Sequence, residues 1–288
     1  MDATSRIEQA LNAALSRAGG KPCPEGLKAA MHHSVFPRGA RVRPRLCLAV
    51  ASACGEDNGA ITDIAAASIE LLHCASLVHD DLPCFDNAAT RRGLPSVHRA
   101  YGEPLALLAG DALIVLAFQN LARISFDARR MSALLFLISR AVGSPYGIVA
   151  GQAWECEPQV DLQHYHRAKT GALFSAATCA GAVAAGSDPE PWRLLGETLG
   201  EAYQVADDLR DALATEEELG KPAGRDAALG RPNAIHALGV DGTLRRLESL
   251  VKAAIAAIPP CDHAAELQSI IASEAKRLRP SSLAQSAA

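Results

Sequence analysis

Aromatic residues are scarce in this chain of 288 residues: they make up 4% of it, whereas hydrophobic residues make up 49%. β-Strands favour aromatic and β-branched side chains, while α-helices favour Ala and Leu. No segment of useful length alternates apolar and polar residues with the period of two that a half-buried strand shows. The composition therefore favours a helical protein over one built from sheets.

An excess of basic charge is also missing, because 28 basic residues stand against 32 acidic ones and the net charge is −4. A nucleic-acid-binding surface requires a basic stripe, so we expect no nucleic-acid partner. A local basic pocket for an anionic substrate remains compatible with this total.

Targeting and membrane-spanning segments are not predicted either. Residues 1–20 mix polar and apolar side chains and lack the basic stub and apolar block of a secretory signal. The most apolar run, residues 105–118, carries Asp111 in its middle and is too short to span a bilayer. The 8 cysteines form no CxxC pair, which is typical of free thiols in a reducing compartment. We therefore expect a soluble, cytoplasmic protein without a membrane span.

What the sequence does have is apolar residues at helical spacing along most of its length. The predicted helices span residues 5–18, 24–36, 41–54, 60–82, 103–123, 128–142, 145–155, 160–185, 189–214, 233–257 and 263–277. The length allows one or two domains, but no linker rich in Gly, Ser or Pro divides the chain. We predict one all-α domain over residues 1–288, a helical bundle with a disordered tail at 280–288.

Two groups of carboxylates interrupt this apolar pattern. The segment "YQVADDLRDAL" contains Asp207, Asp208 and Asp211, which point to roughly one side of a helix because successive residues are about 100° apart. Two carboxylates about 6 Å apart repel each other by about 3 kcal/mol at an effective dielectric constant near 20. A partly buried face with three of them requires cations, and hard oxygen ligands favour Mg²⁺, which also binds substrate phosphates.

The segment "LVHDDLPCFDNAATRRG" has the same character. Asp80 and Asp81 end a predicted helix, and Pro83 allows the chain to turn so that Asp86 approaches them again. Arg91 and Arg92 follow, and arginine binds phosphate with a planar fork of donors. One acidic run alone is usually a solvated helix face. Two such runs inside apolar helices favour a diphosphate held through Mg²⁺ in an apolar cavity, as isoprenoid chemistry requires.

These motifs resemble those of the trans-isoprenyl diphosphate synthase (polyprenyl synthetase) family over nearly the whole chain. The first acidic run is similar to the family's DDxxxxD motif and the second to its DDxxD motif, and "RVRP", "GQAWE", "KTGALF" and "LGKPAGRD" follow the family's order. Four segments are most similar to the corresponding segments of bacterial geranylgeranyl diphosphate synthases of carotenoid pathways: "ELLHCASLVHDDLP", "AGQAWE", "GKPAGRD" and "RPNA".

The resemblance implies a helical bundle around a central apolar cavity, a homodimer, and about three Mg²⁺ ions at the cavity mouth. The implied metal ligands are Asp80, Asp81, Asp86, Asp207, Asp208 and Asp211. The allylic diphosphate is implied to bind Arg91, Lys169 and Lys221, with Thr170 and Gln204 at the reacting centre. Isopentenyl diphosphate is implied to bind Arg43, His73 and Arg92.

The implied reaction is head-to-tail prenyl transfer, in which isopentenyl diphosphate attacks an allylic carbocation formed from dimethylallyl, geranyl or farnesyl diphosphate. Ala75 and Ser76 precede the first acidic run, and a small residue at Ala75 leaves room for a C20 product, geranylgeranyl diphosphate. Three alternatives remain: a farnesyl diphosphate synthase, a weakly catalytic subunit that modulates another prenyl synthase, and a terpene cyclase. The cyclase fits poorly, because Asp211 and Thr215 stand where its second motif has Ser and Glu.

The chain departs from the family pattern at three places, one of which is "LGRPNA", where many members have a lysine and a threonine. Ala40 in "RGARVRP" stands where the family usually has a lysine that contacts isopentenyl diphosphate, and we expect Arg38 or Arg41 to compensate. Tyr203 stands where the family usually has Phe before Gln204.

Overall fold

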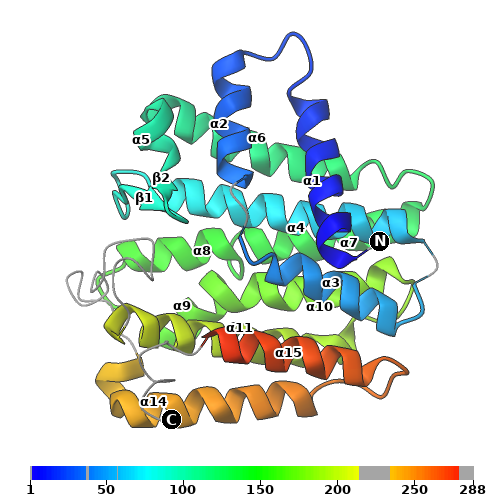
Figure 1. Ribbon diagram of the computed structural model, residues 1–288, viewed down its shortest axis with the longest axis vertical. Coiled ribbons are helices and arrows are strands. Elements are labelled where there is room, and N and C mark those ends of the chain that lie inside the picture. The colour runs from blue at the N-terminus through cyan, green and yellow to red at the C-terminus, as the bar shows by residue number, and fades with distance from the viewer. Residues whose placement is uncertain (1, 37–38, 57, 214–233, 279–288) are drawn as a thin grey trace.

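Helices account for most of the computed structural model, which describes residues 2–36, 39–56, 58–213 and 234–278 (Figure 1). Along the chain the elements are α1 (Ala3–Ala18), α2 (Glu25–Val35), α3 (Val42–Ala53), α4 (Gly59–Asp80), β1 (Thr90–Arg91), β2 (Leu94–Pro95), α5 (Val97–Tyr101), α6 (Glu103–Leu121), α7 (Ala128–Val142), α8 (Ile148–Ala153), the 3₁₀-helix η1 (Trp154–Cys156), α9 (Leu162–His166), the π-helix η2 (Arg167–Gly171), α10 (Ala172–Ala184), α11 (Glu190–Leu213), α14 (Ala234–Ala256) and α15 (Ala264–Leu278). The all-α prediction is confirmed.

Each predicted helix has a counterpart, and the structure adds three local features that the sequence pattern does not predict. The two-residue strands β1 and β2 pair antiparallel around a turn in which Arg92 and Gly93 have positive φ. Strands this short show no period of two, so the sequence pattern does not reveal them. Helix α5 is also too short to show helical periodicity. The stretch predicted as one helix over 160–185 begins at Leu162 and contains the π-helix η2 in its middle.

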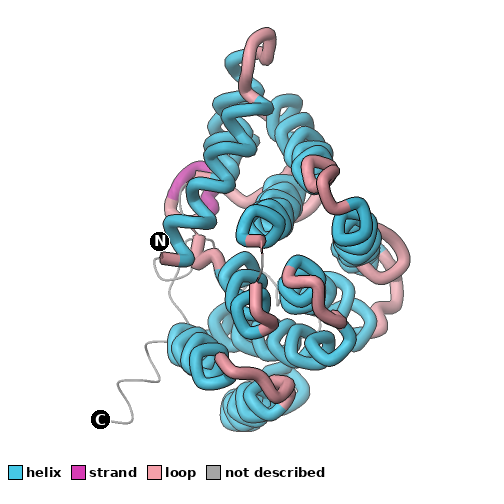
Figure 2. The backbone as a smooth tube through the Cα atoms, turned by 90° about the vertical axis from the view of Figure 1, so that its right-hand side faces the viewer, coloured by secondary structure: helices cyan, strands magenta, loops and turns pink. Residues whose placement is uncertain are grey.

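Helix α4 is the centre of the bundle. It packs against α1, α2, α3, α6 and α10. Its buried positions include Ile61, Ala65, Ile69 and Leu72, as the helical spacing predicts, but others such as Leu71 lie on its remaining faces. A helix that is apolar on all sides is stable only when it is surrounded by protein. Figure 2, in which several helices are seen nearly end-on, shows that they pack as a bundle and not as a flat layer.

Two helices are long and apolar enough to span a bilayer by length and composition alone, α4 and α6. The apolar run of residues 105–118 lies within α6, which flanking residues extend to a greater length. Core helices of soluble proteins meet the same criteria, and α4 and α6 pack against each other inside the bundle. These helices are therefore weak evidence for a membrane span.

Two glycines allow α11 to approach its neighbours closely. A Cβ atom at Gly196 would lie 2.4 Å from the Cα of Ser175 on α10. A Cβ atom at Gly200 would lie 2.5 Å from the Cα of Gly171 at the end of η2. Any larger residue at these positions would push the helices apart, because real Cβ contacts are longer. The glycines thus bring the second acidic run of α11 next to η2.

Candidate active site

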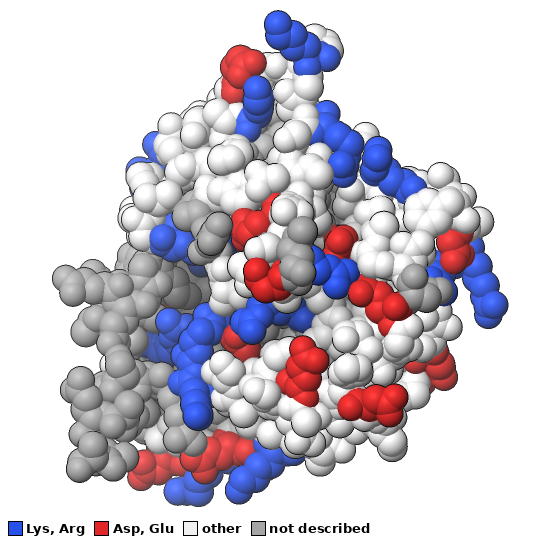
Figure 3. All heavy atoms as spheres, turned by 45° about the vertical axis from the view of Figure 1, so that its right-hand side comes forward, with Lys and Arg blue, Asp and Glu red and all other residues white. Residues whose placement is uncertain are grey.

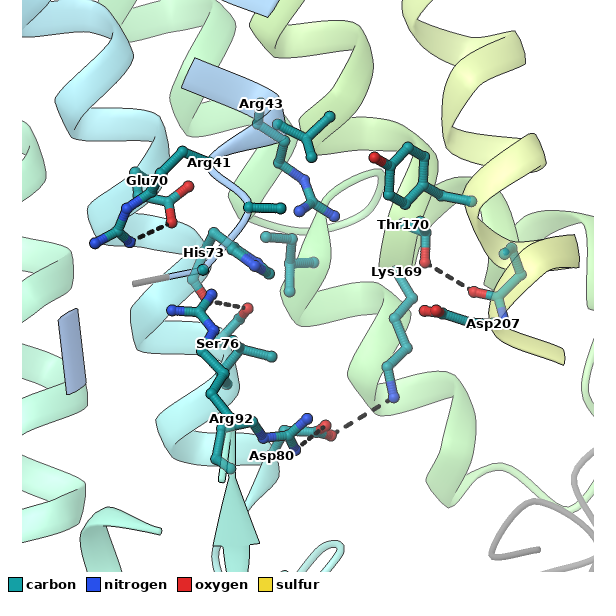
Figure 4. Close-up of a pocket in the computed structure, with 18 of the residues that line it drawn as sticks. Arg41, Arg43, Glu70, His73, Ser76, Asp80, Arg92, Lys169, Thr170 and Asp207 are labelled. Atoms are coloured by element: carbon teal, nitrogen blue, oxygen red, sulfur yellow. Dashed lines mark hydrogen bonds and ion pairs between the residues drawn. The ribbon is translucent and has the colours of Figure 1, made fainter. Parts of the chain in front are cut away.

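A cavity of about 450 Å³ opens between α3, α4, η2 and α11. The residues predicted from the sequence that line it are Arg43, His73, Ser76, Asp80, Asp86, Arg91, Arg92, Lys169, Thr170, Gln204 and Asp207. Figure 4 shows Arg43 and His73 on the α3 and α4 side, and Thr170 and Asp207 on the facing side. On the molecular face drawn in Figure 3, acidic and basic side chains are interspersed.

The first acidic run forms one edge of this cavity. The Asp86 N–H donates a hydrogen bond to the Asp80 carbonyl at 3.0 Å, so the chain returns to the helix end as predicted. Asp80 lies 3.6 Å from Lys169 Nζ and 3.8 Å from Arg91 Nη2. Asp81 is 2% exposed and accepts hydrogen bonds from Arg91 Nε at 3.0 and 3.1 Å. Burial raises the pKa of Asp81, and Arg91 opposes that shift.

The second acidic run faces it from α11. Asp207 lines the cavity, whereas Asp208 and Asp211 are buried. Asp208 accepts hydrogen bonds from Gln204 Nε2 at 3.0 Å and from the Ala234 N–H at 2.7 Å. The three carboxylates therefore do not all point into the cavity, and the ligand role predicted for Asp81, Asp208 and Asp211 stays a prediction.

The α3 and α4 side of the cavity is basic. The Arg43 guanidinium lies 4.3 Å from the centre of the Phe174 ring, and its buried Nε has no hydrogen-bond partner among the described residues. Burial lowers the pKa of Arg43. The pKa of His73 lies well below its usual value, first because the ring is buried and then because Arg43 and Arg92 are close. A buried donor without a partner in a field this positive favours an anionic ligand.

Arg92 also lines the cavity, and its backbone conformation is unusual. Its φ is 54°, and its guanidinium lies over the Cα of Gly39. A Cβ atom at Gly39 would lie 2.5 Å from Arg92 Cζ. The glycine before Ala40 therefore leaves the space that the Arg92 side chain occupies.

Arg41, one of the two residues expected to compensate for Ala40, lines the cavity and is held by acidic side chains. It is 4% exposed, and its three nitrogens donate to Glu8 Oε1 at 3.0 Å, Glu70 Oε1 at 2.7 Å and the Val35 carbonyl at 2.8 Å. A buried guanidinium needs such partners, and they engage three of its five N–H donors. Because Arg41 lines the cavity, a contact with a ligand stays a prediction. Arg38 lies outside the described residues.

The π-helix η2 carries Lys169 and Thr170 to the facing side. Lys169 forms a short ion pair with Glu155, which also accepts a hydrogen bond from the Tyr165 hydroxyl at 2.6 Å. Figure 4 shows the Lys169 side chain reaching toward Asp80. Thr170 Oγ1 donates to Gln204 Oε1 at 2.8 Å. Thr170, Gln204 and Asp208 thus form a continuous hydrogen-bonded chain from η2 along α11.

The two residues predicted to set chain length lie in different surroundings. Ser76 lines the cavity, and its hydroxyl donates to the His73 carbonyl at 2.8 Å. Ala75 is 1% exposed and belongs to the main apolar core, which α4 and α6 share. Lys221 lies outside the described residues.

Sequence reasoning missed several residues that line the cavity, among them Glu70, Tyr165, Arg210 and Arg277. Glu155, which holds Lys169, is part of the "GQAWE" motif, but the motif alone assigns it no role. Arg277 is the least expected of these residues, because it comes from the last helix and no motif surrounds it.

The donor set fits a divalent cation bound together with a ligand. Asp80 and Asp86 on one edge and Asp207 on the other offer hard oxygen ligands to the same cavity. Within the described part of the chain, no three His, Cys, Asp or Glu side chains converge on one point where a metal could be held. Mg²⁺ is usually bound through one or two carboxylates together with substrate phosphates, and this arrangement offers such a site.

Comparisons with known proteins agree with these observations. Residues 24–271 match the family model described as polyprenyl synthetase. A geranylgeranyl diphosphate synthase of Cereibacter sphaeroides is 53% identical over 97% of each chain. A geranylgeranyl diphosphate synthase of Rhodobacter capsulatus is 51% identical over 94% of each chain. A geranyltransferase of Helicobacter pylori, solved with magnesium and isoprenyl diphosphate, superposes with a TM-score of 0.80 at 28% identity, over 96% of this chain and 98% of that one.

Proposed function

Because the chain belongs to the polyprenyl synthetase family and is a prenyltransferase, we propose that it condenses isopentenyl diphosphate with an allylic diphosphate to form geranylgeranyl diphosphate. The observation that carries this proposal is that one cavity has aspartates from two facing elements and, on its α3 and α4 side, a cluster of basic residues; we call the aspartate part the acidic mouth. Two anionic substrates require two binding environments. Aspartates that hold Mg²⁺ provide one of them, and cationic side chains provide the other.

On the acidic side, the proposed direct ligands of Mg²⁺ are Asp80, Asp86 and Asp207. We expect about three ions, which would link the two acidic runs to the allylic diphosphate. Bound there, the ions supply Lewis-acid stabilisation of the charge on the departing diphosphate. Lys169 and Arg91 add positive charge beside Asp80 and orient the allylic diphosphate. Lys221 is proposed to assist them.

On the basic side, Arg43, His73 and Arg92 hold isopentenyl diphosphate with its double bond toward the allylic C1. The low pKa of His73 keeps its ring neutral near pH 7, so it binds by hydrogen bonding without adding charge. Thr170 and Gln204 are fixed to each other beside the reacting carbons. Loss of the allylic diphosphate leaves a carbocation, the isopentenyl double bond attacks it, and the new cation loses a proton to the released diphosphate. Exclusion of water protects both cations.

We propose that the product is C20, because Ala75 is small and two relatives are named geranylgeranyl diphosphate synthase. We propose further that the product serves carotenoid biosynthesis in the cytoplasm. One catalytic domain and a homodimer complete the proposal. The exposed apolar side chains Leu107, Leu108 and Val115 on α6 support an association of two copies.

The test is to incubate purified protein with isopentenyl diphosphate, each allylic starter and Mg²⁺, and to size the dephosphorylated alcohols. We expect a C20 alcohol that disappears with EDTA. Asp80→Asn should lower the rate at least about a hundredfold, since one metal ligand is lost. The matched control Asp241→Asn, exposed on α14, should leave the rate unchanged.

Other outcomes separate the alternatives. A C15 alcohol from the wild-type protein would identify a farnesyl diphosphate synthase. No condensation with any starter would contradict the proposed function and favour the modulating subunit.

A further inference from the structure

At position 40 the cavity lining has a methyl group where the resemblance implies a lysine. Ala40 lines the cavity, and the neighbouring Arg41 uses all three nitrogens in contacts within the protein. The cavity nevertheless has another cation, because Arg277 of α15 lines it together with Arg43 and Tyr203.

Arg277 is held by two residues. Its Nε donates to Glu274 Oε2 at 2.9 Å, and its Nη2 donates to the Tyr203 hydroxyl at 3.2 Å. The Tyr203 hydroxyl in turn donates to Glu274 Oε2 at 2.8 Å. The hydroxyl that distinguishes Tyr203 from a phenylalanine therefore anchors the last turn of α15 at the cavity.

The cluster around Glu274 carries a net positive charge. Its one carboxylate is shared by Arg277 and by Arg45 of α3, whose Nη1 lies 3.1 Å from Glu274 Oε1. Arg277 Nη1 has no partner among the described residues, so a donor remains for a ligand. Charge-assisted hydrogen bonds to phosphate are the strongest that such a group forms.

Aromatic contacts connect this cluster with the basic side. The Tyr203 and Phe174 rings lie 4.5 Å apart, and Arg43 packs on the same Phe174 ring. Arg43, Phe174, Tyr203 and Arg277 thus form one continuous wall built from α3, α10, α11 and α15.

We propose that Arg277 is a further binding residue for the isopentenyl diphosphate, and that Tyr203 and Glu274 are the positioning residues that hold it at the cavity. The proposal rests on the proposed function, since it names an additional contact in the same site. In this proposal, Arg277 of α15 supplies a positive charge that Ala40 cannot supply.

The first experiment measures isopentenyl diphosphate binding by calorimetry in EDTA, because the basic side is made of side chains and not of metal ligands. Arg277→Gln should weaken binding about tenfold, the loss of one charge-assisted hydrogen bond. Arg277→Lys should restore part of the affinity. The matched control Lys276→Gln removes the same charge from an exposed neighbour on α15 and should leave affinity unchanged.

Steady-state kinetics provide the second readout. Arg277→Gln should raise the KM for isopentenyl diphosphate about tenfold and leave the KM for the allylic substrate within about twofold, because the allylic diphosphate binds at the acidic mouth. Tyr203→Phe, which removes only the hydroxyl, should shift the same KM in the same direction by a smaller factor. If Arg277→Gln fails to fold, Tyr203→Phe carries the test.

A double-mutant cycle that combines Ala40→Lys with Arg277→Gln tests whether a lysine at position 40 can replace Arg277. The added lysine should improve isopentenyl diphosphate binding more in the Arg277→Gln protein than in the wild-type protein. Wild-type affinity in Arg277→Gln, with prenyl transfer intact, would overturn the inference and leave the proposed function standing. A wild-type protein that makes no prenyl product would overturn the proposed function itself.

Discussion

Arginine side chains around the cavity have different environments, and these decide what each can bind. Arg41 is neutralised by Glu8 and Glu70, and Arg91 is held by Asp81. Arg43 instead packs on Phe174 and keeps a buried nitrogen without a partner among the described residues. Burial of a guanidinium is costly unless its charge is compensated. An anionic ligand at Arg43 would provide that compensation.

The environment of His73 predicts how stability depends on pH. Its pKa is depressed in the folded protein by burial and by the nearby arginines, so below about pH 6.5 the unfolded chain binds a proton that the folded chain does not. The free energy of unfolding should therefore fall as pH is lowered from about 6.5, and should fall less in His73→Gln. Urea unfolding between about pH 8 and 5 measures this, with the exposed His263→Gln as control. Parallel curves for wild type and His73→Gln would contradict the prediction.

The burial of Ala75 predicts an effect on product length. Ala75→Phe adds a ring in the core shared by α4 and α6, next to the cavity residue Ser76. We expect a shorter main product, and a loss of about 1–3 kcal/mol in the free energy of unfolding through overpacking. Chromatography of the alcohols and urea unfolding measure the two effects. Ala133→Phe on the exposed side of α7 is the control. Unchanged length with reduced stability would show that the product is limited elsewhere.

At the scale of elements, the position of η2 against α11 decides whether the site is assembled. The π-helix carries Lys169 and Thr170, and the close approach at Gly200 allows Thr170 to reach Gln204. π-Helical turns are uncommon and are often found at functional sites. The geometry of the proposed reacting centre therefore depends on how two helices pack as well as on the side chains that they carry.

Gly200→Ala tests this packing. The added methyl group meets the backbone of Gly171, so we expect the free energy of unfolding to fall by about 1–3 kcal/mol. The KM for the allylic substrate should rise, because Thr170 and Gln204 move apart. Denaturant unfolding and steady-state kinetics measure the two effects. In Gly26→Ala the new atom meets only the end of a Leu105 side chain, so this control should be nearly neutral. Equal behaviour of both variants would rule out a role for the close contact.

The helices and the acidic runs were predictable because both leave a local pattern. Repeated apolar residues indicate α4 and α11, and clustered aspartates indicate the cavity mouth. Which aspartate of the first run faces the cavity was not predictable, because it depends on how distant residues pack around Asp80 and Asp81. Arg277 left no signal, since its place at the cavity depends on a contact between segments that are far apart in sequence. The π-helical turn likewise depends on packing.

At the scale of the whole molecule, one face of the bundle is incompletely covered. Leu107, Leu108 and Val115 of α6 are about half exposed, although the opposite side of the same helix packs on α4. Apolar side chains gathered on one helix face favour an interaction surface. In a homodimer, two copies of this face would cover each other, as an isologous interface requires.

Leu108→Glu tests the proposed association. We expect the wild-type protein to sediment as a dimer and Leu108→Glu to shift toward the monomer, because a charge at the centre of an apolar interface is poorly solvated. Leu194→Glu places the same charge at another exposed leucine, on α11, and should remain dimeric. Analytical ultracentrifugation at several concentrations measures the equilibrium. A monomeric wild-type protein at every concentration would contradict the proposal.

The ion pair between Glu8 and Arg41 also limits how far the chain can be shortened. The family match begins at residue 24, after the end of α1. Yet Glu8 of α1 binds the residue that precedes α3 and leads into Arg43. Without Glu8, Arg41 would lose one of its two buried counter-charges. Removal of α1 would also take Ile7 and Leu11 out of the apolar core, so we expect a chain that begins at residue 24 to be less stable than the full chain.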